Sequence, residues 1–333
     1  MVDGPGRSLQ GLNLWYEEVG NIMSEILNRI PEEQNSPRFI EYLAAFSSLY
    51  SQAKVFAGVQ AILTVPIPIA LSLLALLFPG IRVWAAFYGI VISVLDIALI
   101  DFLQQEKKKE AAKVQELFDC ELLDMPWREF VVGDKPIRER IIRAAEHFLK
   151  KPGSRSKILD WYPANVGRLP LHLARVVCQR SNVFFDVELR QYYLRWLNGI
   201  LIGLVVLILA FTIMVKMSME AIVLSISAPV FPTILWLIRE IRKQKQSTER
   251  LARLIRYVEK LLDDAIGKKI SKTEIEAKSR ELQDELYVHR YTNQPIFNWI
   301  YDRLKKRLNF QMTSGAEAIV DNALQSLEPG SNS

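Results

Sequence analysis

The sequence has few of the residues that build disulfide scaffolds, metal sites or disordered chains. Its 333 residues include two cysteines, Cys120 and Cys178, which lie far apart and argue against a disulfide framework or a zinc site. The three histidines, His147, His172 and His289, lack the i, i+4 spacing of paired metal ligands. Fifteen glycines and fifteen prolines are too few for a collagen-like or disordered chain.

Sequence motifs of common enzymes are also absent. The chain contains no GxSxG, HExxH, GxxxxGK or GxGxxG pattern. We therefore expect a protein that is not an enzyme and that needs no metal or other cofactor. No unit of about 20 to 50 residues repeats and no strand-like alternation is sustained, so the chain is expected to be mostly helical.

Apolar and charged residues are separated along the chain. Half of the residues are apolar and 24% are charged, while the mean hydropathy is +0.09. These values fit together only if some stretches are strongly apolar and others strongly charged, as in a membrane protein with large aqueous parts. The net charge of +5 is modest, and basic residues also collect beside membranes. We expect no DNA or RNA polymer as a partner.

Four apolar runs are long enough to cross about 30 Å of hydrocarbon as helices. Short turns join the first run to the second and the third to the fourth, so the runs are expected to form two hairpins. Residues 1–54 lack the apolar core of a signal peptide, so the first run is expected to act as an uncleaved insertion signal. The runs are Val55–Phe78, Ile81–Leu103, Leu197–Val215 and Ala221–Ile238.

The distribution of lysine and arginine predicts the orientation of these runs. Basic residues flank the runs mainly on one side, whereas the turns on the other side offer Arg82 and Lys216. Because positive charge collects on the cytoplasmic side, we expect a multi-pass protein of the cell inner membrane with both termini in the cytoplasm. The unpaired cysteines agree with that reducing compartment.

The predicted fold is an all-α integral membrane protein with four transmembrane helices in two hairpins and a mostly helical cytosolic domain built from three segments. The expected parts are a cytosolic N-terminal amphipathic helical segment (1–54), the first transmembrane hairpin (55–103), a central cytosolic segment (104–196), the second transmembrane hairpin (197–238) and a C-terminal cytosolic helical segment (239–333).

Helical periodicity is clearest near the two ends of the chain. Apolar residues from Leu12 to Ile26 recur every three or four positions, which predicts a helix that packs on the cytosolic bundle or lies in the membrane interface. The stripe from Leu251 to Leu262 suits either internal packing or self-association. Ser271, followed three residues later by Glu274, predicts the start of another helix.

One acidic residue lies within the second apolar run. A carboxylate at Asp96 costs a few kcal/mol unless it is paired or hydrated. Arg195 or Asn198 at the entry to the third run could pair with it, which is a structural role. The alternative is a pore-lining or proton-sensitive position. Prolines within the first and fourth runs predict kinks, which occur in gates and in static bundles alike.

Two clusters combine arginine with aromatic residues. The first extends from Trp161 through Arg175 and Arg180, and the second from Arg290 to Trp299. Guanidinium groups bind phosphate and aromatic faces stack on bases, so both clusters suit a nucleotide. Alternatively, the aromatic residues anchor the cytosolic helices at the membrane surface.

Short motifs spread along the chain carry a resemblance to a known family. They are Leu49-Tyr50 with Ala53-Lys54, Phe118-Asp119 with Pro126-Trp127, Asp160-Trp161-Tyr162-Pro163, Cys178-Gln179-Arg180-Ser181-Asn182 followed by Asp186, and Asn293 and Pro295 followed by Trp299-Ile300-Tyr301 and Arg303. Together with the hairpin layout, they cover nearly the whole chain. In these features the sequence resembles the SMODS-associated four-transmembrane effectors of bacterial CBASS antiphage systems.

The resemblance implies a pore-forming effector in the lipid bilayer. A neighbouring nucleotidyltransferase makes a cyclic oligonucleotide, the cytosolic part binds it, and the effector forms a homo-oligomer that permeabilises the inner membrane, which kills or arrests the infected host. On this reading we expect Arg175, Arg180 and Arg290 to bind phosphate and Trp161 and Trp299 to stack on bases. The alternatives are a membrane scaffold or assembly protein, an ion-channel-like subunit with a protein partner, or a membrane enzyme acting on lipid or nucleotide.

Overall fold

The computed structural model describes residues 28–215, 218–293 and 295–327, and within these ranges every regular element is helical. This agrees with the all-helical class that the sequence predicts. The amphipathic helix predicted from Leu12 to Ile26 lies outside the described residues.

The first half of the fold is a long helical hairpin. Its two arms meet at Pro79, and each arm continues well beyond the apolar run that it contains. Pro66 has no amide hydrogen to donate, so the first arm of this hairpin is interrupted at that residue, as predicted. The elements are α3 (Pro37–Thr64), α4 (Pro66–Leu77), η1 (Pro79–Ile81), α5 (Arg82–Leu95), the π-helical η2 (Asp96–Ile100) and α6 (Asp101–Leu122).

The second half repeats this design with longer helices. One uninterrupted helix of 45 residues, α9, forms the first arm and spans about 68 Å at the usual rise per residue. The second arm begins in short pieces and then continues unbroken into the part that the sequence predicts to be cytosolic, which we call the cytosolic domain after that prediction. The elements are α9 (Leu171–Val215), α10 (Met219–Ile222), the π-helical η5 (Val223–Ser227) and α11 (Ala228–Ile266).

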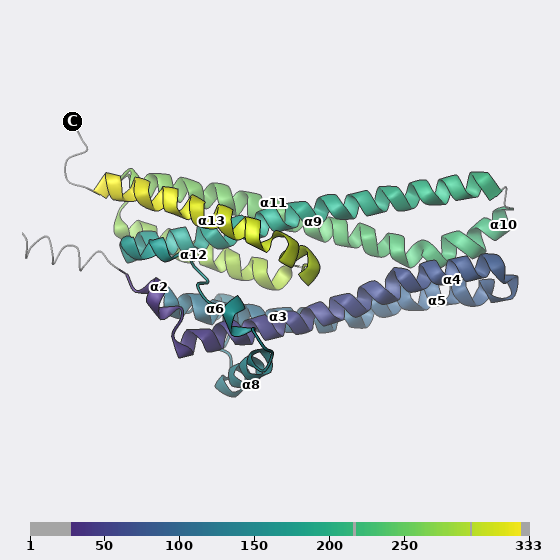
Figure 1. The fold of residues 1–333 in the computed structure, drawn as a ribbon, viewed down its shortest axis with the longest axis horizontal. Helices are drawn as coiled ribbons and strands as arrows, with labels where there is room; N and C mark the ends of the chain where they lie inside the picture. The colour runs from purple at the N-terminus through teal and green to yellow at the C-terminus, as the bar shows by residue number, and fades with distance from the viewer. Residues whose placement is uncertain (1–27, 216–217, 294, 328–333) are drawn as a thin grey trace, which may run out of the picture.

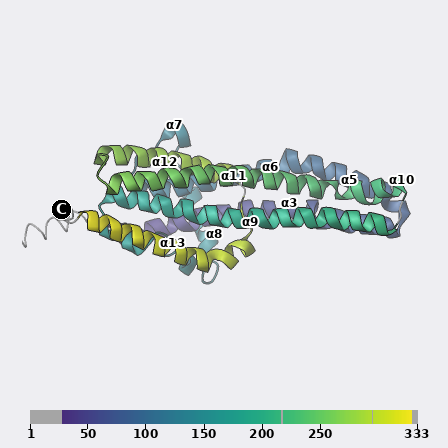
Figure 2. The same ribbon diagram turned by 90° about the horizontal axis from the view of Figure 1, so that it is seen from above.

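Two further helices complete the cytosolic domain. The Ser271 side chain accepts a hydrogen bond from the Glu274 amide at 3.2 Å, so the predicted helix start is confirmed. Figure 2 shows α11 beside the helix that begins after Ser271 (α12, Lys272–Thr292), with the last helix (α13, Asn298–Leu327) along α9. The short elements are α2 (Ile30–Glu33), α7 (Glu129–Val132), α8 (Arg138–Leu149), η3 (Arg155–Lys157) and η4 (Ala164–Arg168).

Three helical stretches in the described residues are long and apolar enough to cross a membrane. They are Pro37–Leu77, Pro79–Leu122 and Leu171–Met214. The fourth apolar run of the sequence is divided among α10, η5 and the start of α11. All the predicted boundaries between cytosolic and membrane segments fall inside continuous helices, so no flexible linker separates the two parts.

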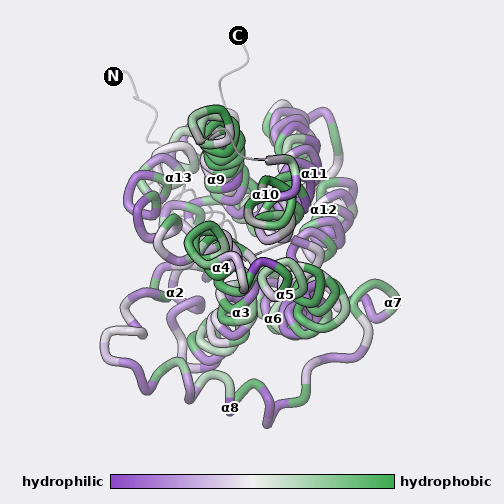
Figure 3. Tube along the Cα trace, turned by 90° about the vertical axis from the view of Figure 1, so that its right-hand side faces the viewer, coloured by the Kyte–Doolittle hydropathy of each residue, from purple (hydrophilic) through white to green (hydrophobic). Residues whose placement is uncertain are grey.

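The parts predicted to lie in the membrane and in the cytosol are at opposite ends of an elongated molecule. In Figure 1 the turns of both hairpins lie at one end, and α2, α8 and α12 lie toward the other. Seen from the hairpin end, the tube is mostly hydrophobic at α4, α5, α9 and α10 (Figure 3). Exposed apolar side chains such as Trp84, Ile90 and Ile213 suit a surface that contacts lipid.

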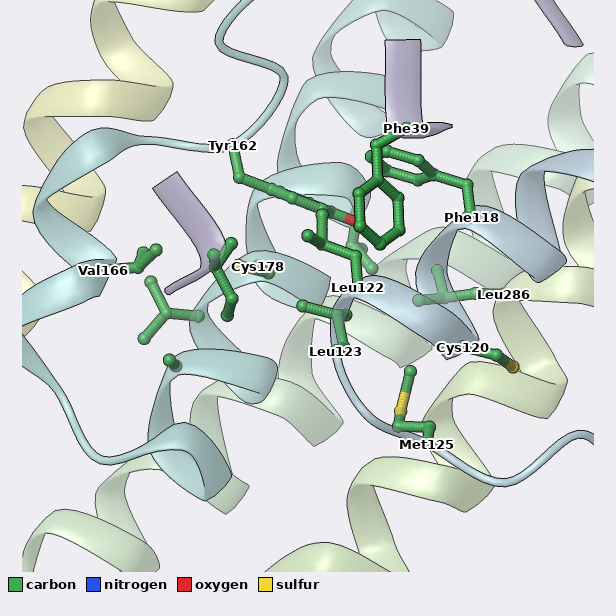
Figure 4. Close-up of a cluster of buried hydrophobic side chains, with 14 of the residues drawn as sticks. Phe39, Phe118, Cys120, Leu122, Leu123, Met125, Tyr162, Val166, Cys178 and Leu286 are labelled. Atoms are coloured by element: carbon green, nitrogen blue, oxygen red, sulfur yellow. The ribbon is translucent and has the colours of Figure 1, made fainter. Parts of the chain in front are cut away.

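Aromatic rings form the centre of the cytosolic core. Phe118 of α6 is fully buried, and its ring packs edge-on against Phe39 and Phe46 of α3 at 5.8 and 6.1 Å. Tyr162 stacks on the same ring at 6.1 Å and brings the loop before η4 into the core. Figure 4 shows the rings of Phe39, Phe118 and Tyr162 together. These contacts join three distant parts of the sequence.

Replacing Phe118 by alanine should lower the free energy of unfolding by about 3–5 kcal/mol, because the buried ring leaves a cavity that its neighbours cannot fill. The matched control is Phe130→Ala, since Phe130 is 103% exposed and its loss should cost no more than about 0.5 kcal/mol. Denaturant unfolding in detergent micelles measures both. Equal losses in the two variants would contradict this assignment of the core.

Candidate functional site

Arg175 stabilises the turn that follows α6. Its guanidinium donates to the carbonyl oxygens of Leu123 and Asp124, both at 2.5 Å, and forms an ion pair with Glu276 of α12 at 3.6 Å. Asp124 has a φ of +51°, a strained conformation that these bonds hold in place. The structure therefore gives Arg175 internal partners, and its predicted role in binding phosphate remains a prediction.

Arg180 lies on the next turn of α9 and is more accessible. Its guanidinium forms an ion pair with Glu259 of α11 at 3.1 Å and lies over the ring of Phe184. Its side chain is 17% exposed, compared with 9% for Arg175 and for Arg290. A phosphate could reach Arg180 by displacing one carboxylate.

Arg290 belongs to a buried group that we call the carboxylate cluster, defined by Glu116, Asp119, Arg280, Gln283 and Arg290. Both carboxylates are fully buried. Arg290 lies 2.6 Å from Asp119 and Arg280 lies 2.8 Å from Glu116. Gln283 donates to both carboxylates at 2.8 and 2.9 Å. The two opposite charge pairs make this burial possible.

The environment of Arg290 favours its charged form. Burial alone lowers the pKa of a guanidinium, but Asp119 and Glu116 raise the pKa of Arg290 above its ordinary value. The Tyr162 hydroxyl donates to Asp119 at 2.6 Å and accepts from Asn182 at 2.9 Å. Sequence reasoning selected Arg290 and named Asp119 as part of a family motif, but it missed Glu116 and Arg280. The signal for these two residues was charge at i, i+3 or i, i+4 spacing on the inner faces of helices.

The two predicted stacking residues have different aromatic neighbours. Trp161 packs edge-on against Phe46 at 5.3 Å, and its indole Nε1 is buried with no hydrogen-bond partner among the described residues. Trp299, at the start of α13, packs edge-on against Trp196 of α9 at 4.9 Å. Arg175 and Trp196 stand on the same helix about 31 Å apart. The predicted ligand residues therefore do not meet at one place.

Asp96 is fully buried between the hairpins and is paired. Its carboxylate forms an ion pair with Arg239 of α11 and accepts a hydrogen bond from Gln60 of α3. The predicted partners, Arg195 and Asn198, were wrong: the Asn198 side chain donates to Leu194 of its own helix. The reason is topological, because α11 rather than α9 packs against α5.

A second ion pair lies one turn closer to the cytosolic domain. Asp101 lies 3.1 Å from Lys243 of α11, and Gln60 donates to Asp101 at 3.2 Å. We call the group of Gln60, Asp96, Asp101, Arg239 and Lys243 the hairpin clasp. It joins three helices at the depth where the apolar runs end.

The π-helical segment η2 explains why the two pairs fit together. The cations of the clasp, Arg239 and Lys243, stand at i, i+4 on α11 and share one face. The acids, Asp96 and Asp101, stand at i, i+5, which in an α-helix would place them about 140° apart. The amide of Asp101 bonds to the carbonyl of Asp96, the i→i+5 pattern of a π-turn. This turn brings both acids to the face opposite the cations.

Buried polar contacts continue from the clasp into the cytosolic domain, and we call them the polar seam. Arg190 of α9 donates to Gln244 of α11 at 2.8 Å and forms an ion pair with Asp186 at 3.0 Å. His289 Nε2 lies 2.6 Å from the same carboxylate. Burial lowers the pKa of His289, although Asp186 opposes that shift, so a neutral imidazole that donates to Asp186 fits this pair.

Comparisons with known proteins agree with this architecture. A family model described as the SMODS-associating 4TM effector domain matches residues 28–319. A probable CBASS effector molecule of Bacillus cereus (strain VD146) is 27% identical over 278 residues, which cover 81% of this chain and 91% of that protein. No solved structure matches.

A double-mutant cycle should show that Asp96 and Arg239 are coupled. Asp96→Asn and Arg239→Gln should each lower the free energy of unfolding by about 3–5 kcal/mol, because each leaves one buried charge uncompensated. The double variant should lose less than the sum, with a coupling of about 1–3 kcal/mol.

The pair Asp101 and Lys243 is the matched reference for that cycle. Its side chains are 26% and 38% exposed, so its coupling should stay below about 1 kcal/mol. Unfolding in mixed micelles at increasing denaturant measures both cycles. Additive losses for Asp96 and Arg239 would show that the clasp is not a coupled unit.

Proposed function

This chain belongs to the family of SMODS-associating 4TM effectors, and from that membership we propose that it is a membrane effector of bacterial antiphage defence. In this proposal a cyclic oligonucleotide made by a neighbouring nucleotidyltransferase binds the cytosolic domain, the effector oligomerises, and the inner membrane becomes permeable. The host is killed or arrested before the phage multiplies. The proposed role involves neither catalysis nor a cofactor.

The hairpin clasp is the observation that carries this proposal. Permeabilisation requires hairpins that hold together at rest and can rearrange on a signal. Buried ion pairs meet both needs. While water is excluded they fix one register of the helices, and when water reaches the separated charges little free energy is lost, because hydration replaces the ion pair. Apolar packing alone would not provide this second arrangement.

Continuous helices link the clasp to the cytosolic domain. α11 carries Lys243 of the clasp and, about 24 Å further along, Glu259, the partner of Arg180. α6 carries Asp101 and, about 27 Å further along, Asp119 of the carboxylate cluster. A shift of either helix at the cytosolic end would therefore move one side of the clasp. The ligand can drive that shift only through a difference in affinity for the two arrangements.

The proposed topology has four spans with both termini in the cytoplasm. The start of α11 packs along α4 and α5, and η5 contacts the same two helices. The fourth apolar run therefore lies at the same depth as the first two. The basic residues beside the runs favour the cytoplasmic placement of the large domain.

We place the first contact with ligand phosphate at Arg180, the most accessible of the three predicted arginines. Arg175 and Arg290 would have to leave their present ion pairs, so they fit a later, rearranged state. Trp161 and Trp299 remain the proposed stacking residues. The indole of Trp161 is the better supported, since its buried Nε1 has no partner in the described part of the chain.

An ion-channel-like subunit is the second candidate. The hairpin clasp and the polar seam favour it, because polar groups that continue from the contact between the hairpins into the cytosolic domain can guide ions along one path. A membrane scaffold or assembly protein would bind a protein partner without opening any path. Single-channel recording separates these candidates from general disruption: discrete conductance levels indicate a channel, irregular bursts indicate disruption, and silence indicates a scaffold.

Arg180→Ala should weaken activation by a cyclic oligonucleotide. Loss of one charged hydrogen-bonding group costs about 1.5–3 kcal/mol, which raises the ligand concentration for half-maximal response about 10- to 100-fold. Dye release from proteoliposomes, with a panel of cyclic di- and trinucleotides, measures this. The control is Arg256→Ala, an exposed arginine on α11. Unchanged release by Arg180→Ala would refute this site, and silence of the native protein with every nucleotide would argue for a scaffold.

Asp96→Asn should make the membrane leaky without any nucleotide. The substitution leaves Arg239 uncompensated between the hairpins, and water is then the best remaining partner for its charge. We expect dye release from unliganded proteoliposomes and slower growth on expression. Asp263→Asn, at an exposed position of α11, should behave like the native protein. Tight vesicles with Asp96→Asn would show that the clasp does not hold the closed arrangement.

A further inference from the structure

The start of α13 lies at the depth where α9 enters its apolar run. Trp196 immediately precedes that run, and Trp299 packs against it edge-on at 4.9 Å. Both indoles remain exposed, at 41% and 47%. Figure 1 shows the first turns of α13 beside α9 near the middle of the long axis, where the hairpin half begins. Half-exposed indoles at this depth are typical of the interface between lipid and water.

The outer face of α13 carries positive charge. Ile300, Leu304 and Leu308 are buried and face the bundle. Arg303 and Lys306 follow Trp299 at helical spacing and are exposed. Arg307 and, on α9, Arg195 extend the same exposed surface. We call Arg195, Trp196, Trp299, Arg303, Lys306 and Arg307 the basic-aromatic surface.

Some exposed arginines of this protein are neutralised by a carboxylate, whereas within the described ranges these four cations are not. Arg38, Arg128, Arg138 and Arg168 all pair with a carboxylate at 2.6–2.8 Å. In the described part of the chain, no hydrogen bond or ion pair involves Arg195, Arg303, Lys306 or Arg307. Asp302, the acidic neighbour on α13, lies close enough to Lys54 to affect its charge. The basic-aromatic surface therefore presents cations that no group among the described residues neutralises.

We propose that the basic-aromatic surface binds the headgroups of anionic phospholipids in the cytosolic leaflet. The surface is continuous with the apolar run of α9, and only 6% of the most apolar window of that helix is buried by the protein. Arg303 lies about 6 Å along α13 from Trp299, and Lys306 and Arg307 about 10–12 Å. All three therefore lie within about a Debye length of the phosphate layer, where each cation adds about fivefold to the affinity.

This proposal rests on the proposed topology but not on activation by a nucleotide. If the lipid test is negative, the prediction for Arg180 and the nucleotide still stands. If the nucleotide test is negative, the prediction for lipid binding still stands. The surface would set the depth and tilt of α13 against the membrane and would make the effector sensitive to the anionic lipid content of its host.

The test compares the full-length protein in detergent with added phosphatidylglycerol or phosphatidylcholine. Phosphatidylglycerol should raise the melting temperature at lower concentration than phosphatidylcholine, and salt at about 0.5 M should remove most of the difference. In the surface variant the half-saturating concentration of phosphatidylglycerol should rise at least about tenfold. The surface variant is Arg195→Gln, Arg303→Gln, Lys306→Gln and Arg307→Gln combined.

A control variant removes the same charge from exposed positions at the far end of the cytosolic domain. It combines Arg256→Gln, Lys260→Gln, Lys268→Gln and Lys272→Gln. This variant should respond to phosphatidylglycerol like the native protein. An equal loss in both variants would overturn the proposal, because it would reduce the effect to net charge.

A second measurement needs no charge substitution. Brominated phosphatidylglycerol should quench more tryptophan fluorescence than brominated phosphatidylcholine, and Trp299→Phe should remove most of that excess. Equal quenching by the two lipids would overturn the proposal. So would stabilisation by inorganic phosphate alone, or by cyclic dinucleotides without lipid, that disappears in the surface variant. The last result would assign the surface to the nucleotide instead.

Discussion

The packing of the two hairpins depends on charges buried where the chain passes from water into lipid. Asp96 can lie fully buried at that depth only because Arg239 and Gln60 neutralise and solvate it. Such a pair adds less to stability than a well-packed apolar contact would. Its effect is specificity: it fixes the register of α11 against the first hairpin, and the π-turn of η2 places Asp101 where Lys243 can extend the same contact.

The cytosolic domain uses the same principle at its centre. Glu116 and Asp119 enter a dry core and are balanced there by Arg280 and Arg290. Between this cluster and the clasp, the polar seam lies along the contacts of α9 with α11 and α12, whereas the aromatic core around Phe118 joins α3, α6 and the loop before η4. The apolar core therefore holds elements together within the cytosolic domain. Polar contacts, in contrast, lie between elements that the proposed function requires to move.

The sequence was enough to predict those features that local composition determines. Four apolar runs predict two hairpins because burial in lipid depends on hydropathy alone, and Ser271 marks a helix start because a cap is a local hydrogen bond. Partners across the fold could not be predicted. Arg239 lies 143 residues from Asp96, far beyond any helical spacing that a local pattern could reveal. Buried and ligand-binding arginines also share the same composition, so Arg175 and Arg290 could not be told from Arg180 until their carboxylates were located.

The location of polar groups also limits where water can cross the membrane. On α9 the outward side chains within the membrane are large and apolar, as Ile202, Val206 and Ile213 illustrate. Two protomers that met through this face would form a dry contact, since no charged group of the described α9 lies within the apolar run. The charged groups at membrane depth lie instead inside one protomer, at the clasp. Under the proposed function, oligomerisation therefore acts by drawing the hairpins of each protomer apart, and water enters at the clasp between them rather than between neighbouring copies.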